Sequence, residues 1–158
     1  MTDGARGFRL PWSRRRPAAV VEHVPPRGLR HVVSVRVGPD AVREAREAVA
    51  AQFVRAGVAP GSAFADAVLL VVSELVTNVL RHAAGSPVTD VGIAITAGEL
   101  VVSVEDAEPR LPALTDDRMG AGLRMVAELA ADYNGGVSAE KAVDHDGKAV
   151  LVRFRIPA

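Results

Sequence analysis

Glu74, Asn78 and Arg81 are polar side chains within the segment 69–82, which is almost wholly apolar except at selected positions. At roughly 100° per residue of an α-helix, Glu74 and Asn78 lie about 40° apart and Arg81 falls beside Glu74. His82 flanks the same stripe. A carboxylate, an amide and a cation therefore lie on one face of a helix whose other faces are apolar. The alternative is the solvent-facing stripe of an amphipathic helix, although such stripes usually favour interchangeable Lys and Glu.

Gly120 and Gly122 stand directly before a helical pattern that begins at Leu123. Glycines at such a place let backbone amides approach an anion, and a helix N-terminus offers unpaired N–H groups and a favourable dipole. Arg118 and Arg124 flank the glycines and are able to add charge-assisted bonds to a phosphate. The alternative is a flexible loop that ends where a helix starts. The sequence has neither the lysine-containing phosphate loop nor a G-x-G-x-x-G fingerprint, which excludes the common nucleotide folds built on them.

Asp106 ends the apolar stretch 100–105 and opens a long loop. A carboxylate at this point can accept a hydrogen bond from an exocyclic amine of a base. The alternative is an aspartate that forms an ordinary turn after a strand. The four histidines lack the spacing of metal ligands, and the chain has no cysteine. This composition excludes disulfide scaffolds, thiolate catalysis and cysteine-ligated metal sites.

Hydrophobic periodicity predicts the elements that must position these residues. The expected strands cover residues 32–37, 88–97, 100–105, 137–143 and 149–156, and the expected helices cover 40–55, 62–83 and 123–131. Ser62 is the expected N-cap of the second helix. The loop 106–119 is long for a compact domain, as lids and binding loops often are. Grouped helices and antiparallel strand pairs indicate an α+β fold with helices on one face of a sheet, rather than a doubly wound nucleotide fold.

The length of 158 residues favours a single domain. Residues 1–30 hold seven arginines against two acidic residues and show no apolar period, so we expect a flexible basic arm there and a globular, net acidic domain over 31–158. The arm is either simply solvated or a contact for nucleic acid or an acidic partner surface. The longest stretch without a charged residue, 56–65, is too short to cross a bilayer. No signal-peptide pattern is recognised, which favours a cytoplasmic protein.

Taken in order, the three motifs resemble those of the GHKL ATPases, the family with the Bergerat fold. Glu74-x-x-x-Asn78-x-x-x-His82 resembles the N box of this family. Asp106 resembles the start of the G1 box, and Gly120-x-Gly122-Leu123 resembles the G2 box. Within this family, the run 73–78 followed by Arg81-His82-Ala83 is similar to actinobacterial serine/threonine kinases of anti-sigma-factor type. The resemblance spans roughly residues 31–157.

The resemblance implies a two-layer α/β sandwich of Bergerat type, with a mixed, mostly antiparallel sheet and ATP under a mobile lid formed by the loop 106–119. It implies that Glu74 is the general base, that Asn78 holds Mg²⁺ against the phosphates, and that Asp106 reads the adenine amine. The glycines of the G2 motif would wrap the phosphates. The further expected ATP contacts are Arg81, His82, Arg118, Gly120, Gly122, Leu123 and Arg124.

The chain departs from the family pattern at two places. Residues 107–112 lack the glycines that usually follow the G1 aspartate. Many relatives place a threonine after Gly-Lys in the final strand to support the adenine, whereas this chain has Ala149 after Gly147-Lys148. The first departure concerns ATP binding and the stiffness of the expected lid, and the second removes a hydroxyl that would support the adenine.

The function that the resemblance implies is a protein serine/threonine kinase that regulates transcription by partner switching. Its acceptor would be a hydroxyl of a small antagonist protein, its second partner a sigma factor, and its assembly a homodimer without membrane association. One alternative is a non-catalytic ATP- or ADP-sensing module that binds a partner protein. A nucleic-acid binder working through the basic arm is disfavoured because the globular part is acidic.

Overall fold

The computed structural model of the chain describes residues 28–115, 117–142 and 145–158. Its strands are β1 (Leu29–Arg36), β2 (Val88–Thr96), β3 (Glu99–Asp106), β4 (Gly136–Lys141) and β5 (Lys148–Arg155), and its helices are α2 (Ala41–Ala50), α3 (Phe53–Ala56), α4 (Ala63–His82) and α5 (Ala121–Asp132). Residues 1–27 of the expected arm lie outside the described residues. Because β1 begins at Leu29, Leu29 and Arg30 belong to the sheet.

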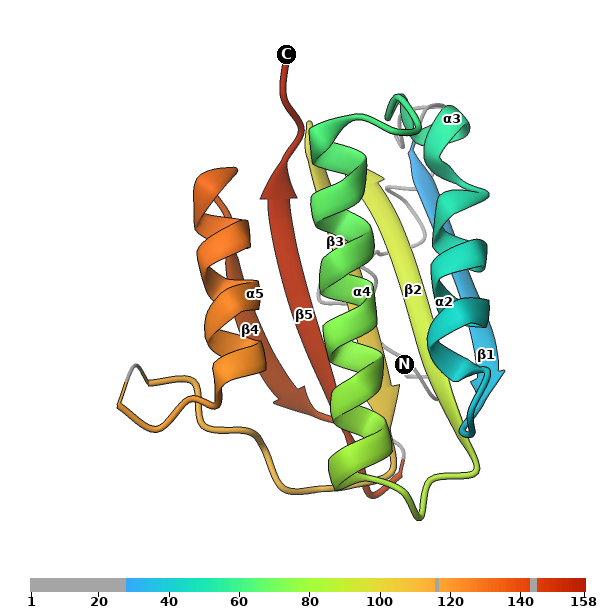
Figure 1. Cartoon of the computed structure of the whole chain (residues 1–158), viewed down its shortest axis with the longest axis vertical. Coiled ribbons are helices and arrows are strands. Elements are labelled where there is room, and N and C mark those ends of the chain that lie inside the picture. The colour runs from blue at the N-terminus through green and yellow to red at the C-terminus, as the bar shows by residue number, and fades with distance from the viewer. Residues whose placement is uncertain (1–27, 116, 143–144) are drawn as a thin grey trace, which may run out of the picture.

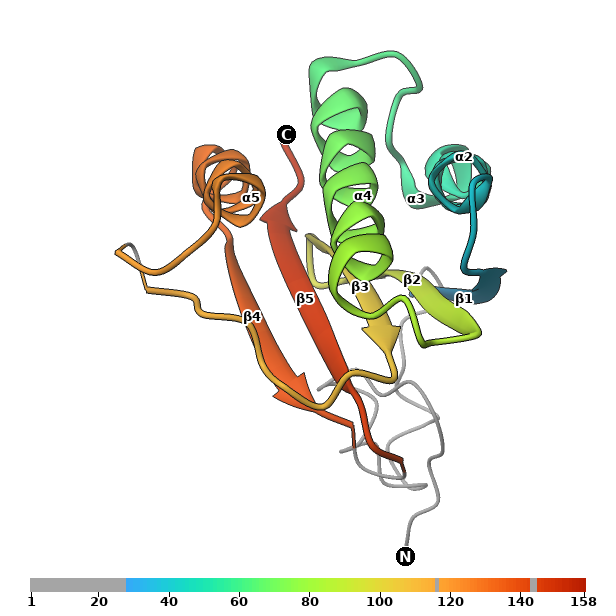
Figure 2. The same cartoon turned by 60° about the horizontal axis from the view of Figure 1, so that its bottom comes forward.

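The five strands form one sheet in the order β1-β2-β3-β5-β4. The helices cover one face of this sheet, with α2 over β1 and β2, α4 over β3, and α5 over β4 and β5 (Figure 1). Figure 2 shows the helices as one layer and the sheet as the other. All four strand pairings are antiparallel. The expected α+β sandwich is therefore confirmed, and its sheet is antiparallel throughout the described part rather than mixed.

Helix α4 is the central helix of the core. The side chains of its inner face that are almost fully buried against the sheet and the neighbouring helices are Val68, Val71, Val72, Leu75, Val76 and Val79. By length and composition alone α4 could cross a membrane, but half of its most apolar window is buried inside the fold. Burying a Val or Leu side chain stabilises a fold by roughly 1.5–3 kcal/mol. This packing therefore fixes the position of the polar residues that α4 carries on its other face.

The helix expected over 40–55 is interrupted in the structure. Helix α2 ends at Ala50, and the N–H of Gln52 bonds the carbonyl of Val49, an i→i−3 contact that tightens the turn. The short helix α3 then places Phe53 in the core, where only 1% of it is exposed. Gly57 follows with φ of +77°, the left-handed conformation that ends helices. The predicted apolar stripe is present, but it is divided between the two helices α2 and α3.

Four segments that are far apart in the sequence meet at one end of the sheet. These are the C-terminal turns of α4, the end of β3, the start of β5 and the first turn of α5 (Figure 2). Helix α5 begins at Ala121, two residues earlier than the periodicity predicts, so the glycine motif forms its N-cap and first turn. The long loop after β3 runs from this end of the sheet to α5 (Figure 1).

Candidate functional site

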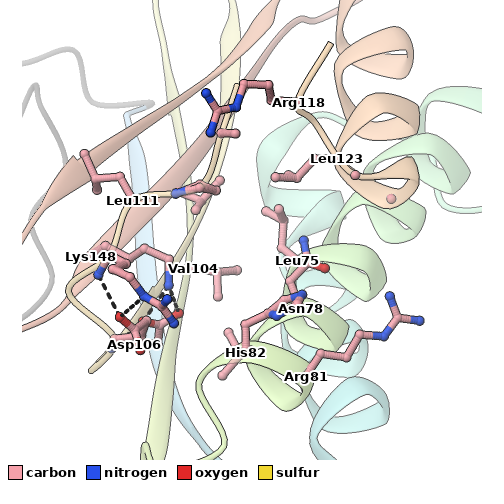
Figure 3. A pocket seen from close by; sticks show the side chains of 18 of the residues that line it. Leu75, Asn78, Arg81, His82, Val104, Asp106, Leu111, Arg118, Leu123 and Lys148 are labelled. Carbon is pink, nitrogen blue, oxygen red and sulfur yellow. Dashed lines mark hydrogen bonds and ion pairs between the residues drawn. The ribbon is translucent and has the colours of Figure 1, made fainter. Parts of the chain in front are cut away.

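A cavity of about 470 Å³ lies where these four segments meet (Figure 3). Its volume falls within the range of roughly 300–1,000 Å³ that is typical of small-molecule sites. The loop after β3 contributes Glu108, Arg110 and Leu111 to the lining, so the segment expected as a lid does border the site. Val104 and Val150 supply apolar surface from the sheet.

The C-terminal part of the polar stripe of helix α4 borders this cavity. Asn78, Arg81 and His82 all line it, together with the apolar Leu75 and Val79. Asn78 is partly buried, whereas Arg81 and His82 are exposed. In Figure 3, Arg81 extends away from the part of the cavity where Asp106 lies. Asn78 therefore faces a concave site, whereas Arg81 and His82 border it and are also open to solvent.

Glu74 lies one turn before Asn78 on α4 and next to the start of α5. It does not line the cavity itself. A Cβ atom added to Gly122 would lie 2.6 Å from the Oε1 atom of Glu74, so the carboxylate occupies the space that a side chain at position 122 would need. Glu74 forms no hydrogen bond or ion pair within the described residues. Its carboxylate is therefore held beside the positive end of α5, where a negative charge is favourable.

Asp106 is buried at the end of β3, with 4% of its side chain exposed. Its two carboxylate oxygens accept hydrogen bonds from Lys148 Nζ at 2.9 and 2.8 Å. The pairing follows from the strand register, because Asp106 and Lys148 are opposite one another on β3 and β5. Oδ1 also accepts the backbone N–H of Glu108 at 2.8 Å. Asp106 is thus a buried, charge-paired carboxylate at the cavity wall that also forms the turn after β3.

Local hydrogen bonds hold the start of the loop after Asp106, the segment that lacks the glycines of the G1 pattern. The N–H of Ala107 donates to Ser86 Oγ at 2.9 Å, and the N–H of Arg110 donates to Glu108 Oε2 at 2.8 Å. The bond from Arg110 lowers the pKa of the Glu108 carboxyl, which therefore stays ionised beside the cavity. The departure from the G1 pattern is accommodated by side-chain contacts.

Lys148 is a cavity residue that sequence reasoning missed, and the emphasis on Ala149 was wrong. Neighbouring residues of a strand point to opposite faces of a sheet. Lys148 and Val150 line the cavity, whereas Ala149 belongs to a buried cluster with Ala94, Val101 and Leu151 on the opposite face. A hydroxyl at position 149 would therefore not reach the site. The signal that could have identified Lys148 was the period of two in β5, which puts Lys148 on the same face as Val150 and Val152.

The first turn of α5 completes the cavity. Gly120, Gly122 and Leu123 line it, together with Arg118 from the loop. Gly120 is the N-cap and has no side chain with which to bond the first N–H groups of the helix. These donors and the helix dipole favour an anion at this end of the site. The glycine motif thus lies at the cavity wall next to α4, where Gly122 packs against Glu74.

Arg124 is the one expected contact that lies elsewhere. Its guanidinium donates to the carbonyl of Met119 at 3.2 Å. It lines a separate groove beside α5, together with Met119 and Glu128, and not the cavity. Its place in the first turn of α5 lets it brace the end of the loop.

A family model of the histidine kinase-like ATPase domain matches residues 35–154, which is more than half of the chain. The chain belongs to this family. A histidine kinase-like ATPase domain binds ATP, so the chain is an ATP-binding domain of kinase-like type. The match runs from β1 to β5 and contains every element that lines the cavity.

Solved structures share the fold of this histidine kinase-like ATPase domain. The histidine kinase AdeS of Acinetobacter baumannii aligns with a TM-score of 0.50 at 14% identity, over 89% of this chain and 74% of that chain. The RsbU and RsbW domains of Rv1364c from Mycobacterium tuberculosis align with a TM-score of 0.58 at 18% identity, over 80% of this chain and 32% of that chain. At these identities the likeness shows the fold alone.

A third solved structure, the histidine kinase domain of a blue-light activated histidine kinase from Erythrobacter litoralis, is 24% identical with a TM-score of 0.45, over 59% of this chain and 45% of that chain. The chain thus spans less than half the length of two of these three solved chains. No curated protein sequence matches it.

Proposed function

We propose that this histidine kinase-like ATPase domain is an ATP- and Mg²⁺-dependent protein serine/threonine kinase that acts as an anti-sigma-factor-like partner switch. One observation carries the proposal. A single cavity holds the buried Asp106 carboxylate at an apolar end and the Asn78 amide beside an uncapped helix N-terminus at the other. These groups suit a base at one end and phosphates at the other.

The base end consists of the sheet and the loop. Val104 and Val150 of the sheet and Leu111 of the loop supply apolar walls for a flat ring. Asp106 is 4% exposed, so a bond between its carboxylate and an exocyclic amine would form away from competing water. We therefore assign Asp106 as the group that accepts a hydrogen bond from the adenine amine.

The phosphate end consists of α5 and the last turns of α4. Gly120, Gly122 and Leu123 bring backbone N–H groups of a helix N-terminus to the cavity, an arrangement that binds phosphate. Arg118 adds a cation from the loop, and His82 lines the same cavity from α4. Arg118 and the N-terminal dipole of α5 would balance part of the charge of a triphosphate.

Asn78 is the residue that would hold Mg²⁺. No group of three or more His, Asp or Glu within the described residues could hold a metal ion by itself. Mg²⁺ in nucleotide sites usually has one or two protein ligands and takes the rest from phosphates and water. The amide oxygen of a partly buried Asn78 fits this pattern. When bound, the ion would neutralise charge on the phosphates during transfer.

Glu74 would act as the general base. It accepts the proton of a serine or threonine hydroxyl of the partner as that oxygen bonds the γ-phosphorus and the bond from this phosphorus to the β-phosphate oxygen breaks. Its carboxylate lies against Gly122, close to the phosphate end, and has no other described partner to compete for it. Phosphoryl transfer depends mainly on positioning and electrostatics, so this small set of groups is sufficient.

The identity of the partners rests on resemblance. The run 73–78 and Arg81-His82-Ala83 are similar to anti-sigma-factor-type kinases, and one solved chain of the same fold contains an RsbW domain. We therefore propose a small antagonist protein as the acceptor, a sigma factor as the second partner, a homodimeric assembly and a cytoplasmic location.

Labelled ATP tests the proposal directly. The full chain is incubated with γ-³²P-ATP, Mg²⁺ and antagonist proteins encoded near it, and label is expected on a serine or threonine of one antagonist. Chelation of Mg²⁺ should abolish the label. Tight ATP binding without any transfer would overturn the kinase assignment.

A non-catalytic ATP- or ADP-sensing module is the second candidate. It is favoured by one observation, namely that Glu74 lies beside the cavity without lining it. Such a module would change its affinity for a partner protein when ATP replaces ADP, without labelling the partner. Measuring partner affinity in both nucleotides, alongside the labelling assay, distinguishes the two functions.

A further inference from the structure

The ion pair of Asp106 and Lys148 leaves one acceptor and one donor unused at the base end of the cavity. An ionised carboxylate can accept about four hydrogen bonds. Asp106 accepts three, two from Lys148 and one from the N–H of Glu108. Lys148 has three N–H protons and uses at most two of them on Asp106. Within the described residues neither group has a further hydrogen bond, and the other charged neighbour of Lys148 is the Glu108 carboxylate, which interacts with it through charge alone.

These two unused positions lie side by side in the cavity. Asp106 and Lys148 both line it, and Figure 3 shows Lys148 directly beside Asp106, with Val104 and Leu111 nearby. Lys148 is only 8% exposed as a residue, so its remaining proton has little access to water. A buried polar group without a partner is costly, which favours a ligand that satisfies it.

We propose that Lys148 is a second base-reading group, which donates its remaining proton to a ring nitrogen beside the amine that Asp106 accepts. This inference rests on the nucleotide site of the proposed function. The 6-amino group of adenine is flanked by two ring nitrogens with lone pairs, N1 and N7. An acceptor and a donor held side by side therefore match an adenine edge better than a lone carboxylate does.

A purely structural ion pair makes a different prediction. In that case the Lys148 ammonium only balances the buried Asp106 charge. A ring nitrogen beside the amine of the base would then add nothing to the affinity of a nucleotide. Removing Lys148 would lower the stability of the fold, because an uncompensated buried charge is strongly unfavourable. It would not change the preference between bases that differ at one ring nitrogen.

Deaza analogues of ATP separate the two cases without any change to the protein. The full chain is titrated by calorimetry with Mg²⁺ and ATP, 1-deaza-ATP or 7-deaza-ATP, which keep the 6-amino group and lack one ring nitrogen. One of the two analogues should bind roughly 10- to 100-fold more weakly than ATP, the usual effect of losing a bond to a charged donor. Equal affinity for all three nucleotides would overturn the inference.

Lys148→Met should bind ATP and the weakened analogue equally. The matched control is Lys141→Met, since Lys141 pairs with Lys148 in the strand register, is exposed and does not line the cavity. This control should keep the wild-type discrimination. Discrimination that persists in Lys148→Met would contradict the role of Lys148.

A second variant covers the case in which Lys148→Met does not fold. Lys148→Gln keeps a neutral donor near Asp106 and should reduce the discrimination to a few-fold. Full discrimination in this variant would overturn the inference. The result is separable from the proposed function as a whole, because a chain that fails to bind ATP contradicts the nucleotide site, whereas a chain that binds ATP and both analogues equally contradicts only the role of Lys148.

Discussion

Asp106 combines a structural and a binding role, and both should respond to Asp106→Asn. The amide loses charge and cannot accept the same set of bonds from Lys148 and a base amine. ATP affinity should fall by about 1.5–3 kcal/mol, the contribution of one charge-assisted hydrogen bond. Calorimetry measures the affinity, and a chemical unfolding curve of the same variant reports the cost of leaving Lys148 without its counter-ion. Unchanged ATP affinity would remove Asp106 from the site.

Gly122 is required by space and not by backbone conformation, so Gly122→Ala should act through Glu74. The added Cβ would lie 2.6 Å from Glu74 Oε1, the far end of a flexible side chain that can move away. Stability should change by less than about 0.5 kcal/mol. Phosphoryl transfer should slow by about 10²-fold, because a shift of this size misplaces the base.

Gly120→Ala is the matched control for this substitution. A Cβ at Gly120 meets no atom within 4 Å, and the residue has φ of −67°, which alanine adopts readily. It should retain most of the transfer rate. Equal losses in both variants would show that the glycines matter for the phosphates and not for Glu74.

Glu74 and Asn78 should be separable by kinetics. Glu74→Gln keeps the size of the side chain but cannot accept a proton, so transfer should slow by roughly 10²–10⁴-fold while ATP affinity stays nearly constant. Asn78→Ala should lower Mg²⁺-dependent ATP affinity and transfer together, since metal and triphosphate bind as one unit. Transfer at the parental rate in Glu74→Gln would favour the sensing module instead.

At the scale of residues, sequence reasoning placed the local motifs and missed a long-range pair. Asn78, His82 and the glycine motif are found around one cavity because each belongs to a local pattern of helix spacing or helix start. Lys148 and Asp106 are 42 positions apart, and their contact depends on the register of β3 and β5. A one-residue change of that register would turn either side chain to the other face.

At the scale of elements, the N-terminus of α4 could be predicted directly from the sequence, because its N-cap is a local signal. Ser62 is the N-cap, and its side chain accepts the N–H of Ala65 at 3.1 Å. Ser62→Ala should therefore destabilise the domain by about 1 kcal/mol in urea unfolding, whereas Ser62→Asp should retain the cap. An equal loss in both variants would mean that the hydroxyl acts through something other than capping.

Helix α2 illustrates where periodicity alone is insufficient. The stripe of apolar residues continues past Ala50, and nothing in the spacing marks the tightened turn that precedes Phe53. The break depends on how closely Phe53 must approach the core, which is a tertiary requirement. In contrast, α4 was predicted to within a residue at either end, because its cap and its closing Gly85-Ser86-Pro87 are local signals.

At the scale of the whole molecule, the cavity joins segments from both halves of the chain. Helix α4 supplies Asn78 and His82, while β5 and α5 supply Lys148 and Gly122 from much later in the sequence. A ligand in this cavity contacts α4, β3, β5 and α5 at the same time. Its binding therefore stabilises the native arrangement as a unit and has no equivalent in the unfolded chain.

ATP should accordingly raise the unfolding temperature of the domain. At a concentration 100-fold above its dissociation constant, ATP with Mg²⁺ should add about 2.7 kcal/mol to the free energy of unfolding. For a domain of this size the expected increase in Tm is roughly 5–15 °C. Asp106→Asn should need about 10- to 100-fold more ATP for the same increase, because its effect acts on binding. Ser62→Ala should begin from a lower Tm and show the full increase, since its cap lies at the opposite end of α4 from the cavity and distant effects add. The same ATP dependence in Asp106→Asn and in the parent chain would place the nucleotide outside this cavity.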